Sequence, residues 1–298
     1  IGDYVLTQSD VRAEGRFEDL IAYGGWTMDD HHPGGIYTKE RPTIFHPAPS
    51  PYGIPYRCLY SKNVENLMFA GRNISVTHTA MSSTRVMATC ALLGQAAGTA
   101  AAIALREGIS PRGVYENGFV PELQQTLMED DCYLPFRSRA INEITRSAAL
   151  SSDMAGAEEL RTGDDRTIGK NANMASGAPG CFAAYTLPEP AMVGHVRLVF
   201  DSDLNRVTLP EREYKLNRAM RHNITLGWEK SYVPRTLMRD FDVIYTLVDG
   251  SVRVEQIRNS HQRLVRVPCG AVIRKVEVRL LATWGAEECH LFAFDLME

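Results

Sequence analysis

Acidic and imidazole side chains gather in a single glycine-rich run near the start of the chain. Residues 24–35 read Gly-Gly-Trp-Thr-Met-Asp-Asp-His-His-Pro-Gly-Gly. A histidine changes its charge near neutral pH, so His31 or His32 can serve as the general base that takes a proton from an alcohol or an amine. The alternative interpretation is a polar surface turn with no catalytic role. Further polar candidates for the substrate side of a site are Tyr56, Arg57 and His78.

The same run is a poor candidate for a metal site, because the side chains of the adjacent residues Asp30, His31 and His32 rarely converge on one ion. The cysteines give no metal signal either, since they are far apart and none stands in a C-x-x-C pair. We expect most of them to be small buried apolar residues. They are Cys58, Cys90, Cys132, Cys181, Cys269 and Cys289.

A second group of residues is suited to binding an anion. Asn66–Arg72 is predicted to be a buried strand that runs into a glycine, where backbone can approach a ligand closely. The loop after it leads to Ser82-Ser-Thr-Arg85, which we place in the first turn of a long helix. That turn would offer hydroxyl groups, a guanidinium and free backbone N–H groups at the positive end of the helix dipole. The alternative is an ordinary capped helix after a glycine turn.

The long helix is expected to begin at Ser82 or Ser83 and to end at Gly108, with Pro111 just beyond it. Residues 86–105 carry no charge, so a membrane span has to be considered. The many alanines and the interrupting polar residues argue instead for a buried helix of a soluble protein.

Other helical features are weaker. Residues 1–55 are rich in turn formers, with one weak helical stretch near Asp10–Tyr23. A second helix is expected over Val120–Asp131, beside the long one. Within the long helix, Gly94 and Gly98 stand about one turn apart, a spacing that we interpret as close packing against a neighbouring element.

Short strands replace helices after Tyr133. Apolar and charged residues alternate in Val272-Ile-Arg-Lys-Val-Glu-Val-Arg-Leu, as in a half-buried sheet. Seven such segments separated by turns predict a β-sandwich. They are Val193–Phe200, Asn223–Leu226, Asp242–Leu247, Ser251–Ile257, Arg263–Val267, Val272–Leu281 and Cys289–Leu296.

Four sequence motifs, taken in their order along the chain, support the interpretation of Asn66–Arg72 and Ser82–Arg85 as an anion-binding site. Together, Ile54-Pro-Tyr-Arg57, Asn66-Leu-Met-Phe-Ala-Gly-Arg72, Ser82-Ser-Thr-Arg-Val-Met87 and Gly94-Gln-Ala-Ala-Gly-Thr-Ala-Ala101 resemble the C-terminal flavin-binding segment of bacterial FAD-dependent oxidoreductases of the glutathione-reductase-like class. The resemblance covers roughly residues 20–110.

The resemblance implies FAD as the cofactor and assigns residues to it. Ala70, Gly71 and Arg72 would line the phosphate and ribityl portion. The turn formed by Ser82, Ser83, Thr84 and Arg85 would point its N–H groups at the pyrimidine edge of the flavin. Reduced flavin gathers negative charge at that edge, which a helix N-terminus and Arg85 would stabilise.

The chain departs from the family in one respect. It contains no G-x-G-x-x-G between a strand and a helix, the turn that normally receives the FAD pyrophosphate. We therefore expect this chain alone to bind FAD weakly or not at all and to be inactive by itself. The missing nucleotide-binding half is expected either to have been removed or to be supplied by a completing chain.

The expected architecture is α+β. Residues 1–136 form the incomplete FAD-binding domain, residues 137–149 a linker, and residues 150–298 an antiparallel β-sandwich. The sandwich resembles, in a general way, the galactose-binding or discoidin-like jelly rolls attached to sugar-active proteins. Aromatic residues that could stack on a sugar ring, or could instead pack at the end of the sandwich, are Trp228, Tyr232 and Trp284.

The net charge of the chain limits the classes of partner that can be expected. A net charge of −4 gives no basic field, so neither nucleic acid nor a membrane is expected as a partner, and a small molecule or sugar fits better. The expected function is oxidation of a small organic or carbohydrate-like substrate by hydride transfer to flavin, in a bacterial periplasmic or extracellular location. The alternative is a non-catalytic carbohydrate-binding or structural module of flavoenzyme ancestry. A polysaccharide lyase is a third, unsupported by any Tyr/His/Asn arrangement.

Overall fold

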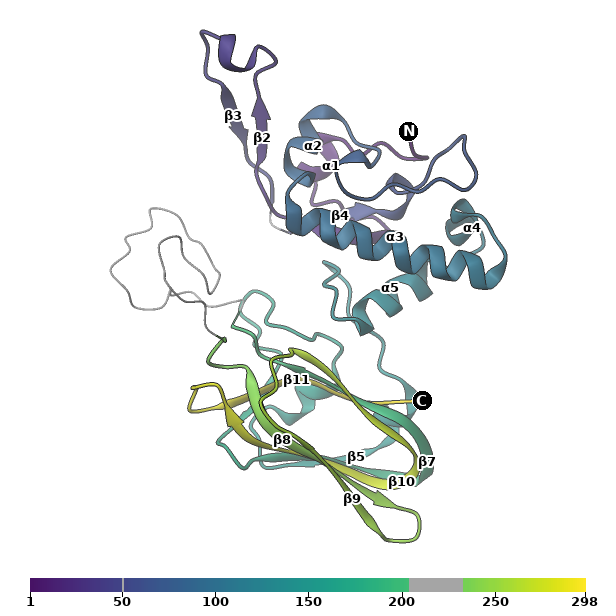
Figure 1. Ribbon diagram of the computed structural model, residues 1–298, viewed down its shortest axis with the longest axis vertical. Helices are drawn as coiled ribbons and strands as arrows, with labels where there is room; N and C mark the ends of the chain where they lie inside the picture. The colour runs from purple at the N-terminus through teal and green to yellow at the C-terminus, as the bar shows by residue number, and fades with distance from the viewer. Residues whose placement is uncertain (50, 204–232) are drawn as a thin grey trace. The chain divides into compact units, whose positions relative to one another are not determined.

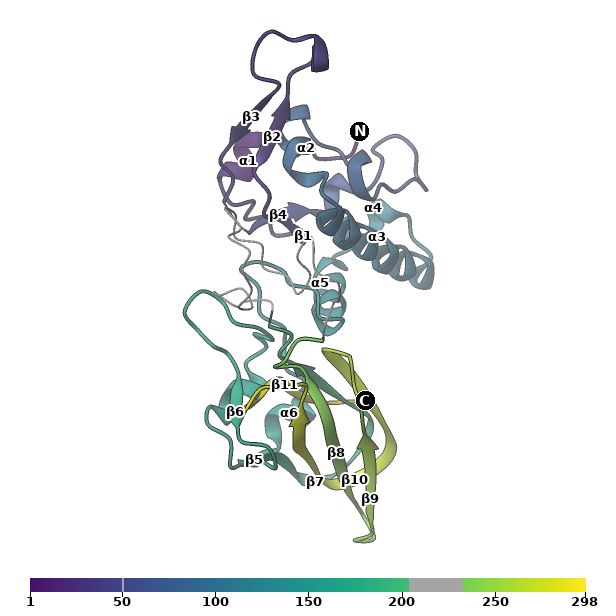
Figure 2. The same cartoon turned by 60° about the vertical axis from the view of Figure 1, so that its left-hand side comes forward.

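Two compact units make up the chain, Ile1–Ser138 and Arg139–Glu298 (Figures 1 and 2). The structure is a computed structural model that describes residues 1–49, 51–203 and 233–298. The expected linker, residues 137–149, falls mostly in the second unit, where it includes the short helix α6 (Glu143–Ser147).

The first unit combines two small antiparallel strand pairs with five helices. Strand β1 (Leu20–Gly24) pairs with β4 (Tyr52–Pro55), and β2 (Met28–His31) pairs with β3 (Thr43–His46) in a separate ribbon. The helices are α1 (Gln8–Arg12), α2 (His78–Thr84), α3 (Met87–Glu107), α4 (Pro111–Glu116) and α5 (Val120–Glu129). Short 3₁₀ turns occur at η1 (Gly35–Tyr37), η2 (Tyr56–Cys58) and η3 (Gly71–Asn73).

Helix α3 is the central element of the first unit. Its residues Leu93, Ala96 and Ala100 are fully buried in a core that also contains Tyr52 and Leu123. In length and composition α3 would also suit a membrane span, but in this unit one of its faces packs in the core. The helix ends as expected at Gly108, which adopts the left-handed conformation with φ of 66°.

The predicted start of the long helix is wrong. Ser82 and Ser83 do not cap it but lie inside the preceding helix α2, which is capped by the Thr77 side chain. A break at Arg85 and Val86 then separates α2 from α3. The prediction was wrong because several serines and threonines that could cap a helix precede the break, whereas the actual N-cap residue of α3, Val86, has no capping side chain.

Two other local predictions are wrong. The stretch Asp10–Tyr23 is helical only in α1, because the chain then turns through Gly15 and enters β1. The stretch Asn66–Arg72 is not a buried strand: one isolated bridge joins Met68 to Tyr60, and Leu67 is 44% exposed. Met68 and Phe69 are only partly buried against the core of the first unit, so the apolar residues of this stretch gain less burial than a core strand would give them.

The second unit is the expected antiparallel β structure. Within its described residues, seven strands form one continuous hydrogen-bonded sheet in the order β6-β11-β7-β10-β8-β9, with β5 on a further part of the long strand β7. The strands are β5 (Ala149–Ser152), β6 (Ala175–Gly177), β7 (Phe182–Phe200), β8 (Met238–Leu247), β9 (Val252–Ile257), β10 (Leu264–Thr283) and β11 (Cys289–Met297), and a 3₁₀ turn, η4 (Ala157–Arg161), precedes β6.

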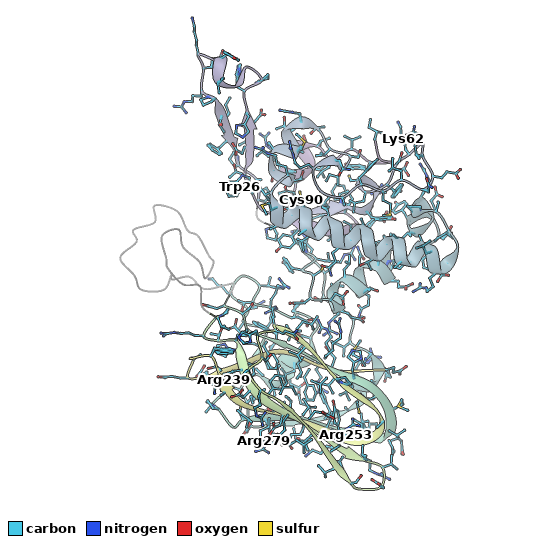
Figure 3. All side chains as sticks on the ribbon, in the orientation of Figure 1. Trp26, Lys62, Cys90, Arg239, Arg253 and Arg279 are labelled. Atoms are coloured by element: carbon cyan, nitrogen blue, oxygen red, sulfur yellow. The ribbon has the colours of Figure 1, made fainter. Side chains whose placement is uncertain are left out.

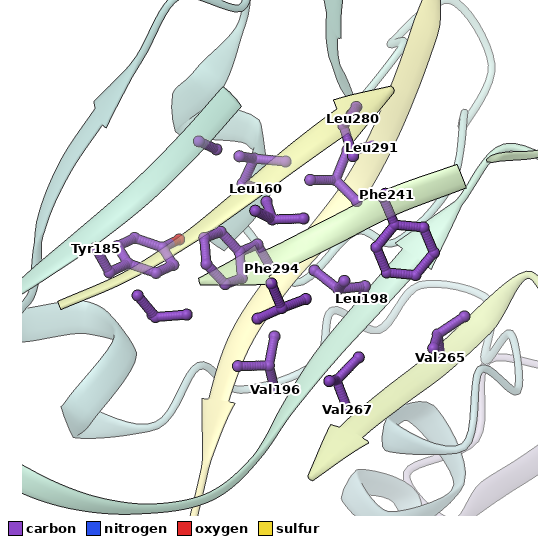
Figure 4. Close-up of a cluster of buried hydrophobic side chains, with 14 of the residues drawn as sticks. Leu160, Tyr185, Val196, Leu198, Phe241, Val265, Val267, Leu280, Leu291 and Phe294 are labelled. Carbon is purple, nitrogen blue, oxygen red and sulfur yellow. The ribbon is translucent and has the colours of Figure 1, made fainter. Parts of the chain in front are cut away.

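Long irregular strands allow this sheet to fold over a single core. Strands β7 and β10 pair along most of their length, and their register shifts between Pro268 and Ala271 and again between Ile273 and Lys275. The core draws large side chains from several strands, including Tyr185, Phe241 and Phe294 (Figure 4). The result is the β-sandwich architecture that the alternating pattern predicted.

The predicted strand boundaries needed correction in two places. Arg263–Val267 and Val272–Leu281 were expected as separate strands but are one strand, β10, because the chain passes Cys269 and Gly270 as an irregularity without leaving the sheet. The predicted strand Val193–Phe200 is the second half of the longer β7. The predicted strand Asn223–Leu226 lies outside the described residues.

Candidate functional site

A buried hydrogen-bonded chain connects α2 to β4 and to the loop before β2. The Ser83 hydroxyl lies 2.5 Å from the backbone carbonyl of Trp26 and 2.5 Å from the Tyr52 hydroxyl. Because the carbonyl can only accept, Ser83 donates to Trp26 and Tyr52 donates to Ser83. Burial raises the pKa of Tyr52 to about 12, so the phenol keeps the proton that it donates. Ser83 therefore holds α2 in place.

The predicted acidic and imidazole residues meet along the β2–β3 ribbon. His78, the first residue of α2, lies 3.3 Å from the Asp30 carboxylate, and His31 lies 3.7 Å from that of Asp29. The ring of His31 also contacts the Thr43 hydroxyl across the ribbon at 3.0 Å. The structure thus pairs His31 with Asp29 and His78 with Asp30. In each pair a histidine can accept a proton and be stabilised by the carboxylate when charged.

His32 has a different environment. Its Nδ1 accepts the backbone N–H of Gly34 at 3.0 Å, so its other ring nitrogen carries the proton in the neutral form. That nitrogen lies 3.8 Å from the Glu40 carboxylate, near the end of the ribbon. These contacts fit the interpretation of a polar turn.

Tyr56 and Arg57 lie apart from the histidines. The ring of Tyr56 is fully buried, and its hydroxyl donates to the carbonyl of Pro111 at 2.7 Å. The guanidinium of Arg57 makes two hydrogen bonds, of 2.9 and 3.0 Å, to the fully buried carboxylate of Asp19, and this pairing raises the pKa of Arg57 further. Both side chains make contacts that stabilise the unit, and neither is part of the proposed site.

The predicted cofactor residues gather around the start of α3. Gly71 has φ of 85°, and a Cβ added to it would lie 3.6 Å from the Cβ of Cys90. Cys90 lies in the first turn of α3 (Figure 3). Ala70 and Arg72, on either side of Gly71, are exposed. The chain at Gly71 is therefore close to the helix start and open on its other side.

The start of α3 has features that suit an anionic ligand. The first backbone N–H groups of a helix have no partner within it, and Val86 provides no capping side chain. One residue before the break, Thr84 is fully buried, and its hydroxyl has no hydrogen-bond partner. The next residue, Arg85, is held 3.7 Å from the Asp29 carboxylate. The sequence predicted Ser82 or Ser83 as the capping residue of this helix, whereas the residue that precedes α3 is Val86.

These features fit part of an FAD site. Gly71 permits close approach of a ribityl or phosphate group, and the free N–H groups of α3 suit the electron-rich edge of a flavin. The fit is partial, because the sequence holds no glycine-rich dinucleotide turn for the pyrophosphate.

The aromatic candidates of the second unit are only partly described. Trp284 is half-buried, and its ring nitrogen donates a hydrogen bond to the carbonyl of Ser260. The centre of the exposed His261 ring lies 4.5 Å from the centre of the Trp284 ring. Arg239 lies 6.0 Å from the same ring. Trp228 and Tyr232 lie outside the described residues. Among the residues that the structure describes, no cluster could hold a metal ion.

The first unit matches a known enzyme family over most of its length. Residues 1–127 match the family described as FAD dependent oxidoreductase, which confirms the resemblance found in the sequence. The family implies FAD in the full protein. No curated protein matches the sequence.

Solved structures similar to this chain are carbohydrate-binding modules. They include the family 32 module of EndoD from Streptococcus pneumoniae (12% identity, TM-score 0.36, covering 52% of this chain and 99% of that chain). The fucose binding module SpX-3 from Streptococcus pneumoniae (7%, 0.37, 53% and 98%) and the family 32 module of NanJ from C. perfringens (9%, 0.33, 51% and 93%) are similar to the same extent. At these TM-scores the likeness carries no weight for ligand or fold, and the β-sandwich rests on its own strand pairing.

Proposed function

We propose that the first unit forms the cofactor-facing wall of an FAD-dependent oxidoreductase that oxidises a small organic or carbohydrate-like substrate. The observation that carries this proposal is the uncapped start of α3 beside Gly71 and the unpartnered hydroxyl of Thr84, within a segment that matches the FAD dependent oxidoreductase family. When bound in the complete enzyme, FAD supplies the acceptor for the hydride that the substrate loses.

Three groups of the chain hold the cofactor in this proposal. The backbone at Ala70–Arg72 lies against the ribityl and phosphate portion. The N–H groups that begin α3 face the flavin edge that becomes negative on reduction, and the helix dipole favours that charge. Arg85 adds positive charge nearby, and its link to Asp29 joins the cofactor side to the substrate side.

On the substrate side, His78 takes the proton of the substrate hydroxyl or amine. Its ring is 70% exposed and so open to a substrate, and Asp30 at 3.3 Å stabilises the charge that the ring gains. His31 with Asp29 is the second such pair, on the same ribbon. The proposed oxidation requires a base for the proton and an acceptor for the hydride. The two histidine–carboxylate pairs involve residues of β2, and β2 contacts α2, the helix that ends at Arg85.

A completing nucleotide-binding half covers the outer face of α3 in this proposal. Met87 and Leu105, at the two ends of that face, are 89% and 83% exposed. Between them, a Cβ added to Gly94 or Gly98 would meet no atom within 4 Å. These glycines do not pack against the described chain, contrary to expectation. A bare helix face of this kind suits another layer that approaches the backbone closely.

The test of cofactor binding compares this chain with the complete gene product. The complete protein should be yellow, with flavin released on denaturation, whereas this chain should bind FAD substoichiometrically. Thr84→Val in the complete protein should weaken FAD binding roughly three- to tenfold, the effect of one lost hydrogen bond of about 1 kcal/mol. The same substitution should not lower, and should if anything raise, the thermal stability of this chain, because a buried hydroxyl without a partner is itself destabilising. A colourless complete protein would overturn the proposal.

The test of the substrate side measures anaerobic bleaching of the flavin by a set of aldoses, alditols and amino alcohols. For any compound that bleaches wild-type protein, His78→Asn should slow bleaching by roughly 10²-fold, the usual contribution of a general base. His32→Asn is the matched control and should react at the wild-type rate. Equal rates for wild type and His78→Asn would remove His78 from the mechanism.

A second candidate function, carbohydrate binding by the second unit, is favoured by one observation. The exposed ring of His261 lies beside the half-buried Trp284, with a guanidinium from Arg239 near the same ring. Aromatic and charged groups side by side suit a sugar ring and its hydroxyls. Retention of this chain in affinity electrophoresis on galactose-containing polysaccharide, lost in His261→Ala and kept in His195→Ala, would support it.

A further inference from the structure

Two of the six cysteines meet in the second unit. Cys181 stands directly before β7, and Cys289 is the first residue of β11. Both are buried, with 6% and 0% of their surface exposed, and both are free thiols in this structure. Of the other thiols, those of Cys58, Cys90 and Cys269 contact backbone carbonyl oxygens.

The residue directly opposite Cys289 in the sheet is a glycine, and the side chain of Cys181 occupies the space that a side chain at that glycine would take. Strand β6 pairs with β11 so that Gly177 is directly opposite Cys289. A Cβ added to Gly177 would lie 2.9 Å from the Cβ of Cys181 and 3.0 Å from its sulfur. Cys181 thus fills the space left by the glycine. Side chains directly opposite in an antiparallel pair have Cβ atoms about 5 Å apart, close to the roughly 4 Å of a disulfide.

The backbone holds both cysteines in this arrangement. The carbonyl of Cys181 accepts the N–H of Leu280 at 2.9 Å, and the neighbouring Gly180 donates to the carbonyl of Leu280 at 2.6 Å. Cys289 is fixed by its pairing in β11. Each thiol is also the largest single influence on the pKa of the other. The strand register and the backbone contacts therefore place the two cysteines at a spacing that a disulfide can bridge.

We propose that Cys181 and Cys289 are a modification site at which a small-molecule disulfide, such as oxidised glutathione, introduces an intramolecular disulfide. Cys181, after losing its proton, attacks the small-molecule disulfide, and one small thiol leaves. Cys289 then loses its proton and attacks the sulfur of Cys181 in the mixed disulfide, and the second small thiol leaves. The two protein thiols are oxidised, and the small-molecule disulfide is reduced to two thiols.

The order of attack follows from the contact between the thiols. The interaction with Cys289 lowers the pKa of Cys181, and the interaction with Cys181 together with burial raises the pKa of Cys289, so Cys181 is the first to become a thiolate. The product joins the start of β11 to the turn before β7 and encloses β7, β8, β9 and β10 in one covalent loop. Closing so long a loop restricts the unfolded chain strongly, which stabilises the folded unit.

Peptide mapping tests the proposal. The full chain is incubated with oxidised glutathione, once folded and once during refolding from urea, and free thiols are then alkylated and the chain digested without reduction. The expected result is one pair of linked peptides containing Cys181 and Cys289, with the other four cysteines alkylated. Alkylated or singly glutathionylated Cys181 and Cys289 after both treatments would overturn the proposal.

Thermal unfolding provides a second measurement. Oxidation should raise the Tm of the wild-type second unit by about 5–15 °C, and reduction with dithiothreitol should reverse the rise. The matched control Cys269→Ala, at a thiol as buried as Cys181, should keep the rise, and Cys181→Ala should lose it. An equal rise in both variants would show that the stabilisation does not come from this pair.

Discussion

Four buried charges form a closed network in the second unit. The guanidinium of Arg197 lies 2.8 Å from the carboxylate of Asp165 and 3.0 Å from that of Asp295, and Arg139 contacts the same two carboxylates at 3.1 and 2.8 Å. All four side chains are at most 9% exposed. Each charge is compensated on two sides, which is the condition under which buried ions are tolerated.

Removing one member should therefore be costly. Arg139→Met leaves two carboxylates with a single cation, and we expect a loss of about 3–5 kcal/mol in the free energy of unfolding, measured by urea denaturation. Arg146→Met, which breaks only the exposed pair with Glu143, should cost less than about 1 kcal/mol. Similar losses in the two variants would contradict the assigned role of the network.

His290 makes the stability of the second unit depend on pH. Its ring contacts the carboxylate of Asp201 at 2.9 Å and that of Glu288 at 3.5 Å. The hydrogen bond to Asp201 raises the pKa of His290 above its ordinary value of 6.5. Although burial acts in the opposite direction, the hydrogen bond from His290 and the other favourable contacts bring the pKa of Asp201 below 3.8.

The two shifts define a window of greatest stability. The stabilisation from His290 is complete below its unfolded pKa and is lost as the pH rises through its higher folded pKa. The stabilisation from Asp201 is present above its unfolded pKa and is lost as the pH falls through its lower folded pKa. The contribution of the pair should thus be largest between about pH 4 and 6.5.

Tm measured from pH 3 to 9 tests this window. His290→Gln should lower Tm most inside the window, and its effect should shrink as the pH rises through the folded pKa of His290. His261→Gln, at an exposed histidine, should follow the wild-type profile. A His290→Gln deficit that does not change with pH would show that the charge of His290 does not contribute.

At the scale of elements, α3 contains two glycines, Gly94 and Gly98, where a side chain would meet no other part of the described chain. Gly94→Ala and Gly98→Ala should each raise the free energy of unfolding by about 0.5–1 kcal/mol, because alanine favours a helix and the added methyl group meets open space. Gly71→Ala is the opposing control and should destabilise, since φ of 85° suits glycine alone. Urea denaturation measures all three, and destabilisation by the α3 substitutions would mean that this face is not open.

At the scale of the molecule, the border between the units lies before Arg139. This residue and α6 belong to the second unit, where Arg139 completes the ionic network and the Asn142 side chain donates to the carbonyl of Leu296. A chain that begins at residue 139 should therefore unfold cooperatively, whereas one that begins at residue 150 should be less stable by several kcal/mol. Thermal unfolding followed by circular dichroism distinguishes them, and equal Tm values would place the border later.

The sequence by itself determined the class of each half. Strong alternation between Val272 and Leu280 predicted a half-buried strand, and a long uncharged alanine-rich stretch closed by Gly108 predicted the central helix. Such periodic patterns depend on local geometry and on which face is buried, so they can be read without knowing the neighbours. The flavoenzyme resemblance likewise rested on motifs in order along the chain.

Tertiary structure alone decided where helices begin, which polar groups meet and which faces are left bare. Val86 precedes α3 without a capping side chain, so the local sequence does not mark the helix start. The bonds of Ser83 to Tyr52 and to the Trp26 carbonyl join positions far apart in the chain. The meeting of Cys181 and Cys289 required the register of β6 with β11, which links positions far apart in the chain. These features arise from long-range contacts, whose energies no local pattern of residues records.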